Sequence, residues 1–122
     1  FLFFSFFIQQ MQISENIINE KTDIWSLGVT LYELLTFKNP FKENSIKKTI
    51  DKIIKGYPYP LRTYNKKIPI ELEAIVLKCL ENKPENRYAS IEEVSKDLNN
   101  YLDLRPIKAK PDSIIRKTKK QL

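Results

Sequence analysis

Apolar residues recur every three or four positions in four stretches of the 122-residue chain, a pattern that predicts helices packed against a core. In the first stretch, 22–36, apolar side chains cover most of the circumference, so this helix should run through the middle of the fold. We expect Thr22 or Asp23 to cap its start, because short polar side chains accept hydrogen bonds from the first free amides of a helix. Pro40 then marks the loop beyond its end.

Three more helices follow, each bounded by a recognisable start or stop residue. Isoleucines and lysines occupy opposite sides of 45–55, which is typical of a surface helix, and a glycine ends it. Pro69 should lie in the first turn of a third helix, 69–81, because the amide that proline lacks is not used there. The spacing of Ser90 and Glu93 is that of a capping box and predicts the start of a fourth helix.

The expected fold class is mainly α, with four main helices, loops and a basic tail in a single domain. No stretch shows the polar and apolar alternation of a convincing strand. The chain holds only two glycines, so it has no glycine-rich loop of the kind that cradles nucleotide phosphates. We therefore do not expect these 122 residues to bind a nucleotide on their own.

The net charge of +6 lies in 105–122, because basic and acidic residues balance in the rest of the chain. The basic residues of this segment are Arg105, Lys108, Lys110, Arg116, Lys117, Lys119 and Lys120. The apolar period also fades after Leu104, so we expect 105–122 to be a mobile basic tail. Such a tail attracts polyanions, and nucleic acid or an anionic membrane is the weakest of our partner hypotheses.

The chain contains no histidine, which excludes Ser-His-Asp and Cys-His nucleophile pairs and histidine-ligated zinc. Its one cysteine, Cys79, lies in an apolar stretch, where we expect a buried thiol in a reducing compartment such as the cytoplasm. The apolar run at 1–8 is too short to cross a bilayer and has no basic leader, so we expect no membrane helix or signal peptide. We treat 1–11 as an apolar segment of doubtful origin, either a buried strand or a terminus carried over from a longer or misassembled reading frame.

Three motifs stand out along the chain: the run KTDIWSLGV at 21–29, the Pro-Phe pair at 40–41 and the turn CLENKPENRY at 79–88. Together they closely resemble the C-terminal lobe of eukaryotic-type serine/threonine protein kinases, in spacing as well as in residue type. The resemblance covers 12–102, and the segment 97–111 looks like the extension of bacterial-type members. It implies that 12–104 is a partial protein kinase domain that holds helices F to I of the C-lobe.

The resemblance gives Asp23 a structural role. In the family, the aspartate at this position accepts hydrogen bonds from backbone amides of the catalytic loop, which implies that Asp23 anchors that loop. The alternative is an ordinary acidic residue that the helix macrodipole favours. Trp25, Ser26 and Gly28 complete the kinase signature together with Arg87, and none of these residues is expected to be catalytic.

In the family, the arginine that Arg87 matches pairs with the glutamate of an Ala-Pro-Glu motif. Gln9, Gln10 and Met11 stand at the three positions of that motif here, so the ion pair should not form as it does in the family. A buried guanidinium that loses its acid costs about 3 to 5 kcal/mol, which makes Arg87 a predicted weak point. The alternative, at equal weight, is a solvated arginine beside Glu85.

Two further interpretations concern contacts with other proteins. Glu33 matches an acid that kinases with basic substrates use to contact an arginine near the phosphorylated residue, and the alternative is a solvated helix acid. The helix at 45–55 matches a docking surface for substrates or regulators in many relatives, with a solvated lysine face as the alternative. Thr30 and Leu34 match positions that support a column of apolar residues in the family, or they simply pack in the core.

Phosphoryl transfer needs a glycine-rich loop, a strand lysine paired with a glutamate, a His-Arg-Asp loop and an Asp-Phe-Gly metal ligand, and these 122 residues contain none of them. We expect no cofactor or metal in this chain, and ATP with Mg²⁺ in the intact family domain. One hypothesis is a fragment of a serine/threonine kinase whose parent transfers the ATP γ-phosphoryl group to protein Ser or Thr. The alternative is a non-catalytic, pseudokinase-like module that binds proteins. Alone, the chain should be inactive and should expose an apolar patch on the helix predicted at 22–36.

Overall fold

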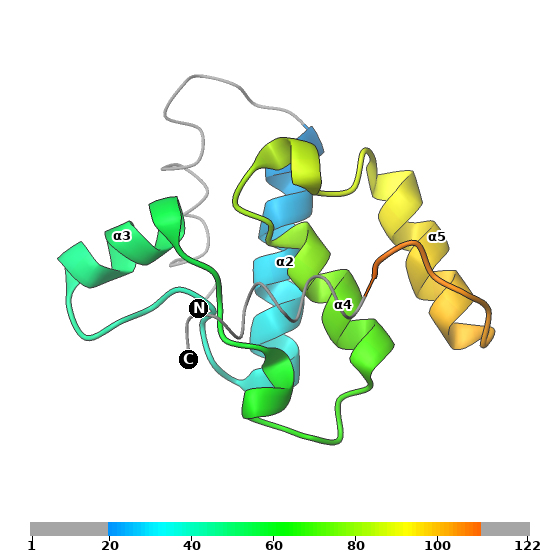
Figure 1. Cartoon of the computed structure of the whole chain (residues 1–122), viewed down its shortest axis with the longest axis horizontal. Helices are drawn as coiled ribbons and strands as arrows, with labels where there is room; N and C mark the ends of the chain where they lie inside the picture. The colour runs from blue at the N-terminus through cyan, green and yellow to red at the C-terminus, as the bar shows by residue number, and fades with distance from the viewer. Residues whose placement is uncertain (1–19, 111–122) are drawn as a thin grey trace.

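The computed structural model describes residues 20–110, which form a helical fold (Figure 1). Its elements are α2 (Glu20–Thr36), α3 (Ile46–Lys55), the short 3₁₀ turn η1 (Leu61–Thr63), α4 (Ile70–Cys79), the 3₁₀ turn η2 (Pro84–Asn86) and α5 (Ile91–Leu102). No strand occurs between residues 20 and 110. This confirms the mainly α fold class with four main helices. Our expectations for 1–11 and 111–122 lie outside the described residues.

The helix α2 runs through the centre of the fold, as its apolar pattern predicts. α4 packs along it, and α5 lies against α4 and α2 (Figure 1). Ile24, Trp25, Val29 and Tyr32 are each no more than 1% exposed. These side chains, with those of α4, form the largest part of the hydrophobic core.

The start of α2 differs from our prediction. The helix begins at Glu20, so neither Thr22 nor Asp23 caps it. The added turn is held from outside the helix, since the Arg87 guanidinium donates to the Lys21 carbonyl at 3.1 Å. The Lys21 ammonium in turn donates to the Tyr88 carbonyl at 3.0 Å. Bonds from residues more than sixty positions away therefore extend the helix beyond its local start signal.

The other helix ends follow local capping chemistry, with one shift. The Ser45 and Ser90 side chains accept the amides of Lys48 and Glu93, each at 3.2 Å, which confirms both predicted starts. α4 is shorter than the predicted 69–81. Pro69 precedes the helix as its N-cap, and its extended backbone (ψ 145°) keeps it out of the first turn.

Gly28 allows α2 and α4 to approach closely. A methyl group placed on Gly28 would lie 2.8 Å from the Cys79 Cβ and 3.0 Å from two side-chain atoms of Leu80. Atoms at that separation overlap, so no larger residue fits without moving one helix. Cys79 itself is fully buried, as predicted, and burial raises the pKa of its thiol from 9.0 to about 12.

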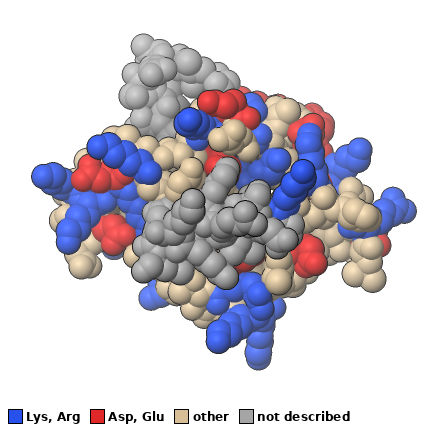
Figure 2. Space-filling view, in the orientation of Figure 1, with Lys and Arg blue, Asp and Glu red and all other residues tan. Residues whose placement is uncertain are grey.

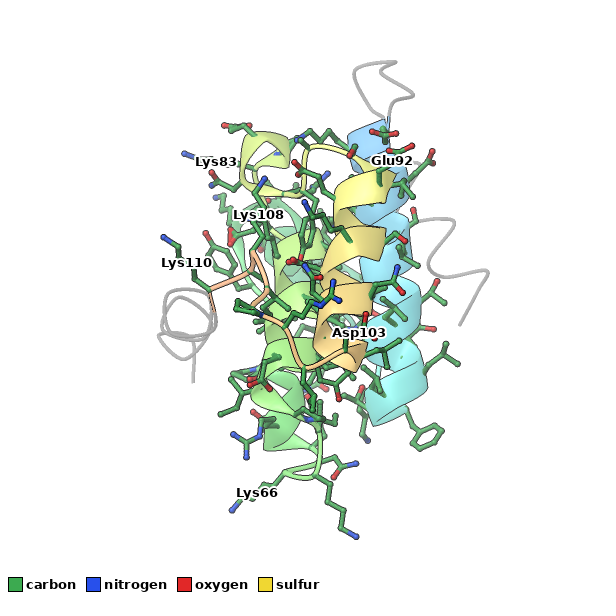
Figure 3. All side chains as sticks on the ribbon, turned by 90° about the vertical axis from the view of Figure 1, so that its right-hand side faces the viewer. Lys66, Lys83, Glu92, Asp103, Lys108 and Lys110 are labelled. Carbon is green, nitrogen blue, oxygen red and sulfur yellow. The ribbon has the colours of Figure 1, made fainter. Side chains whose placement is uncertain are left out.

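Residues 105–110, which we assigned to the basic tail, lie against the helical body and are called the strap below. Figure 3 shows the strap, with Lys108 and Lys110 labelled, turning back beside α5 and α4. Ala109 is 2% exposed, and Ile107 packs against the core. The basic composition of 105–122 therefore conceals a short segment that belongs to the folded body.

Candidate functional site

The first turn of α2 presents an exposed acid next to a buried aromatic ring. Asp23 is exposed, whereas Trp25, two positions on, is 1% exposed. The Trp25 ring stacks on Phe41, with ring centroids 5.3 Å apart and planes inclined by 20°. Two motifs that the sequence places sixteen residues apart thus meet in one aromatic contact.

A partly buried polar pair fixes the loop that carries Phe41. The Glu33 carboxylate is 8% exposed and accepts a hydrogen bond from Asn39 Nδ2 at 2.8 Å. The Asn39 side-chain oxygen accepts the amides of Phe41 and Lys42 at 2.9 and 3.1 Å. Our alternative of a solvated Glu33 is therefore wrong, because the carboxylate orients this loop. Its contact with a basic substrate stays a prediction.

One stripe of α2 is only partly buried. It consists of Asp23, Ser26, Thr30 and Leu34, which lie three or four residues apart and so share a helix face. Leu34 is 66% exposed, and the buried Ser26 hydroxyl has no hydrogen-bond partner among residues 20–110. We call these four residues the open stripe. Leu34 is its one apolar member, so our expectation of an apolar patch on this helix stays a prediction. The alternative that Leu34 packs in the core is wrong, because its side chain is exposed.

Arg87 joins the end of α4 to the start of α2. It is 4% exposed, and its guanidinium donates to the carbonyls of Glu81, Asn82 and Lys21 at 2.8, 3.3 and 3.1 Å. A cation near the C-terminal end of α4 is also stabilised by the negative end of the dipole of that helix. The alternative of a solvated turn arginine is wrong, because the guanidinium is buried and donates to backbone carbonyls. The positions of the Ala-Pro-Glu motif, 9–11, lie outside the described residues.

Burial changes the acid strength of the groups at this junction. It lowers the pKa of Arg87 to about 10, which still leaves the guanidinium charged at neutral pH. Burial, followed by a hydrogen bond to Asp97, raises the pKa of the Tyr88 hydroxyl far above its ordinary value. Burial does the same to Tyr32, whose hydroxyl donates to the Tyr59 carbonyl at 2.6 Å. Neither hydroxyl ionises in the folded protein under physiological conditions.

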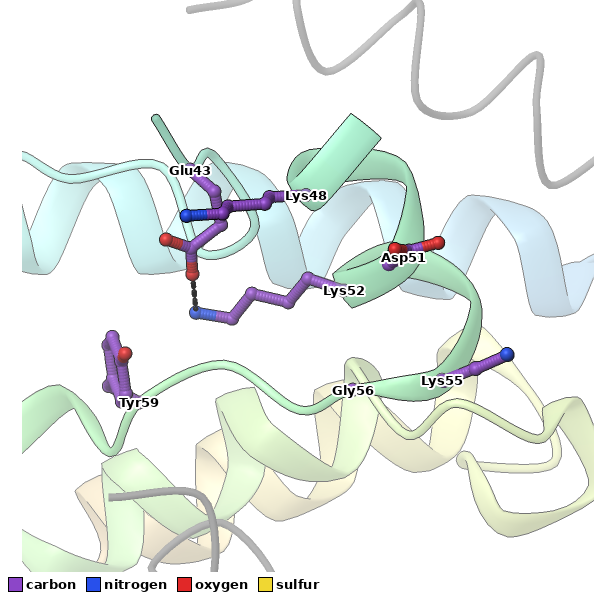
Figure 4. A pocket seen from close by; sticks show the side chains of 7 residues that line it. All are labelled: Glu43, Lys48, Asp51, Lys52, Lys55, Gly56 and Tyr59. Atoms are coloured by element: carbon purple, nitrogen blue, oxygen red, sulfur yellow. Dashed lines mark hydrogen bonds and ion pairs between the residues drawn. The ribbon is translucent and has the colours of Figure 1, made fainter. Parts of the chain in front are cut away.

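A second polar feature lies at α3, which projects from one side of the body (Figure 1). Beside it lies an open surface pocket of about 450 Å³. Its lining residues, drawn in Figure 4, are Glu43, Lys48, Asp51, Lys52, Lys55, Gly56 and Tyr59. The Lys52 ammonium bonds to Glu43 at 3.0 Å and lies 3.9 Å from the centre of the Tyr59 ring. Both contacts tie α3 to the loops on either side of it.

The surface of α3 combines charges with uncovered apolar residues. On the face shown in Figure 2, basic and acidic side chains are interspersed over this helix, at the left of the view. Ile46 and Ile54 are 79% and 57% exposed. In residues 20–110 no three acidic or cysteine side chains gather as a metal site would require. None of the helices in that range is long and apolar enough to span a bilayer.

Comparison with known proteins gives the same family as the motifs at 21–29, 40–41 and 79–88. The family model for protein tyrosine and serine/threonine kinases matches residues 8–98, most of the chain. The chain belongs to this kinase family. A probable serine/threonine-protein kinase of Clostridium acetobutylicum is 40% identical over 80 residues, which are 66% of this chain and 12% of that protein.

Two other kinases show the same partial coverage. The serine/threonine-protein kinase PknD of Protochlamydia amoebophila is 40% identical over 86 residues, which are 68% of this chain and 9% of the length of PknD. The tyrosine-protein kinase MasK of Myxococcus xanthus is 36% identical over 85 residues, 70% of this chain and 13% of its own. The chain thus spans about a tenth of the length of these curated kinases.

Sequence reasoning missed three buried acids, Glu73, Glu81 and Asp97. Of these, Asp97 is 2% exposed and joins separate segments of the chain. Its position carried a signal, because it lies three residues after Val94 and four before Tyr101, on the apolar face of α5. A charged residue in an apolar stripe must find partners when the stripe is buried. Two partners of Asp97, the amides of Lys108 and Ala109, come from the strap, which no helix pattern places near it, and the third is the Tyr88 hydroxyl.

Proposed function

We propose that the chain is the part of a serine/threonine protein kinase domain on which the catalytic loop is mounted. Other residues of the intact domain then bind ATP with Mg²⁺ and transfer its γ-phosphoryl group to protein Ser or Thr. The chain contributes a rigid support, since α2 is packed on one side and open on the other. A catalytic loop held in this way gains rate because its groups are kept in a reactive geometry.

The exposed Asp23 carries this proposal. Its neighbours in the signature, Trp25 and Gly28, are buried and serve the packing of this chain. The Asp23 side chain is exposed instead and stands at the head of the open stripe. One turn on, the Ser26 hydroxyl has no hydrogen-bond partner within residues 20–110. A carboxylate and a hydroxyl on one face suit backbone amides and carbonyls of a further segment.

A chimeric kinase tests the proposal. Residues 8–110 would replace the corresponding segment of the Clostridium acetobutylicum relative, and phosphorylation of a serine peptide would be measured. Asp23→Asn keeps the size of the side chain but removes the charge that orients amides. We expect it to lower kcat about a hundredfold, the loss typical of a slightly misplaced reactive group.

Controls separate this effect from loss of folding. Asp51→Asn changes an exposed acid on α3 and should leave kcat unchanged. The stabilisation of the chimera by Mg-ATP, read as a thermal shift, should be the same with and without Asp23→Asn, because the nucleotide contacts lie elsewhere. Unchanged kcat in the Asp23→Asn chimera would refute the anchoring role.

A second candidate function is a non-catalytic module that binds a protein through α3. The exposed Ile46 and Ile54 beside the lysine-lined pocket favour it. It predicts that Ile46→Glu abolishes capture of a partner while leaving the melting temperature unchanged. Saturable stabilisation of the 122-residue chain by Mg-ATP would count against both candidates, since each leaves nucleotide binding to residues outside this chain.

A further inference from the structure

Asp97 is a buried carboxylate with three hydrogen bonds. Its Oδ2 accepts the Tyr88 hydroxyl at 2.6 Å and the Ala109 amide at 3.0 Å, and its Oδ1 accepts the Lys108 amide at 2.7 Å. Bonds to an ionised acceptor are short and strong, and two consecutive amides on one carboxylate define the path of the backbone. The acid therefore holds two separate segments in one place.

The first of these segments is the strap. It leaves α5 through Leu104, whose φ of 58° turns the chain sharply back. The Arg105 amide donates to the Asn100 carbonyl at 2.7 Å and the Leu104 amide to the Tyr101 carbonyl at 3.2 Å, a pattern that closes a helix end and reverses the chain. Lys108 then pairs with Glu93 at 2.9 Å, at the far end of the same helix.

The second segment leads from Asp97 to the open stripe. Tyr88 bonds to Asp97 through its hydroxyl, while its carbonyl accepts the Lys21 ammonium at 3.0 Å. Arg87, next to Tyr88, donates to the Lys21 carbonyl at 3.1 Å. Lys21 lies in the first turn of α2, two residues before Asp23. The strap is thus connected to the turn that carries Asp23 through the bonds of Asp97, Tyr88 and Lys21, and Arg87, the residue before Tyr88, adds one more bond to that turn.

We propose that Asp97 is a positioning residue, which fixes the strap to α5 and, through Tyr88, holds the first turn of α2 and the Asp23 carboxylate in place. The strap is then a working part of the support, and a force or partner that detaches it loosens the anchor of the catalytic loop. The consequence for catalysis rests on the function proposed above, whereas the coupling from strap to α2 is a property of this chain alone.

Hydrogen exchange on the 122-residue chain tests the coupling without any kinase assay. Asp97→Asn keeps the shape of the side chain but replaces one acceptor by a donor. We expect the amides of Lys108 and Ala109, and also those of Ile24 and Trp25 in α2, to exchange about tenfold faster or more, as for a lost bond to a charged group. Acceleration confined to the strap would overturn the coupling.

Tyr88→Phe provides a second variant in case Asp97→Asn unfolds the chain. It removes one hydroxyl and leaves both amides of the strap on Asp97. We expect faster exchange at Ile24 and Trp25 with the strap still protected, and unchanged α2 exchange would overturn the proposal. In the Tyr88→Phe background, Asp97→Asn should add nothing further at α2, because the connection is already cut.

Glu93→Gln is the matched control. It breaks the ion pair with Lys108 but touches none of the bonds of Asp97, so exchange at Ile24 and Trp25 should stay as in the parent chain. Faster α2 exchange in this variant would show that any loosening of the strap suffices, which contradicts a route through Asp97.

The chimeric kinase supplies the catalytic readout. There Asp97→Asn should lower kcat and leave the KM for ATP unchanged, since only the geometry of the anchor is altered. Coupling in the exchange experiment with unchanged kcat would overturn the positioning role, provided that Asp23→Asn lowers kcat. Where Asp23→Asn also has no effect, the function proposed for Asp23 has failed and the coupling within the chain stands.

Discussion

The body formed by α2, α4 and α5 and the projecting helix α3 are held by different kinds of interaction. The body is joined by long-range contacts: aromatic stacking at Trp25, the close approach at Gly28 and the forked bonds of Arg87. α3 has no extensive contact with another helix in the described part of the chain and is held by its caps, an ion pair and two buried side chains. The body should therefore unfold as one unit, and α3 should open on its own.

Replacing the Trp25 ring should have the largest effect on stability. Trp25→Ala removes a fully buried ring that stacks on Phe41. This should lower the free energy of unfolding by about 3 to 5 kcal/mol. Ile46→Ala, at a 79% exposed position of α3, should change it by no more than about 0.5 kcal/mol. Urea denaturation measures both values, and similar losses from the two variants would erase the distinction between body and α3.

Gly28→Ala should destabilise the body less severely. The new methyl group meets the Cys79 Cβ at 2.8 Å, and the overpacking should cost about 1 to 3 kcal/mol despite the better helix propensity of alanine. Adding Cys79→Gly, which removes the opposing Cβ, should restore part of the loss relative to Cys79→Gly alone. Thermal unfolding of the four chains gives the coupling. Purely additive losses would mean that the two helices do not meet as described.

Alkaline pH should weaken the body and spare α3. The Cys79 pKa is raised from 9.0 to about 12, so its contribution is complete below pH 9 and is lost as pH rises toward 12. The slope of this loss should be about 0.7 kcal/mol per pH unit at pH 9 and approach about 1.4 kcal/mol per pH unit near pH 10. Tyr32 and Tyr88 add to this loss above pH 10, where Arg87, with its lowered pKa, acts in the opposite direction.

The thiol has its largest share of the slope between pH 9 and 10, because the tyrosines contribute fully only above pH 10. Cys79→Ala should flatten the dependence there, whatever its effect on absolute stability. Urea midpoints at closely spaced pH values measure the slope. An equal slope with and without the thiol would assign the titration to another group.

The two serine caps should separate local from global stability. Ser45→Ala and Ser90→Ala each remove one bond to a helix amide, worth about 1 kcal/mol. We expect Ser90→Ala to lower the unfolding free energy of the whole body, and Ser45→Ala to accelerate hydrogen exchange in α3 only. If Ser45→Ala lowered the free energy of global unfolding, α3 would have to unfold together with the body.

The smallest predicted effect is a gain in stability at the end of α5. Leu104 is 94% exposed and has a left-handed backbone, which costs a side-chain-bearing residue about 1 kcal/mol. Leu104→Gly should raise the unfolding free energy by up to about that amount, whereas Asn99→Gly, inside the helix, should lower it by about 0.3 kcal/mol. Differential scanning calorimetry distinguishes the two signs.

The difference between the two regions also explains which features the sequence predicts. α3 is governed by residues within its own stretch, so Ser45, its isoleucine stripe and the closing glycine predict its bounds closely. The start of α2 depends on Arg87 and Tyr88, which come more than sixty residues later. Local capping rules place that start two residues too late for this reason.

The strap shows the limit of reasoning from composition. Its lysines and proline are typical of a solvated tail, and charge counting gives no sign that its backbone amides are its important groups. Asp97 offered the missing hint, as an acid within an apolar face, but the pattern alone does not say which segment reaches it. The role of Asp23 is likewise a matter of family resemblance, since nothing in its spacing separates an anchor from an ordinary acid.

The planar fork of Arg87 limits which cation can stand at this position. Among residues 20–110, its Nε, Nη1 and Nη2 donate to the carbonyls of Glu81, Lys21 and Asn82, one carbonyl to each nitrogen. A lysine would carry the same charge, but its single ammonium cannot reach oxygens spaced around a plane. The junction therefore requires the planar shape of the guanidinium as well as its positive charge. Arg87→Lys, which keeps the charge, would break the bonds that connect α2 to the turn after α4.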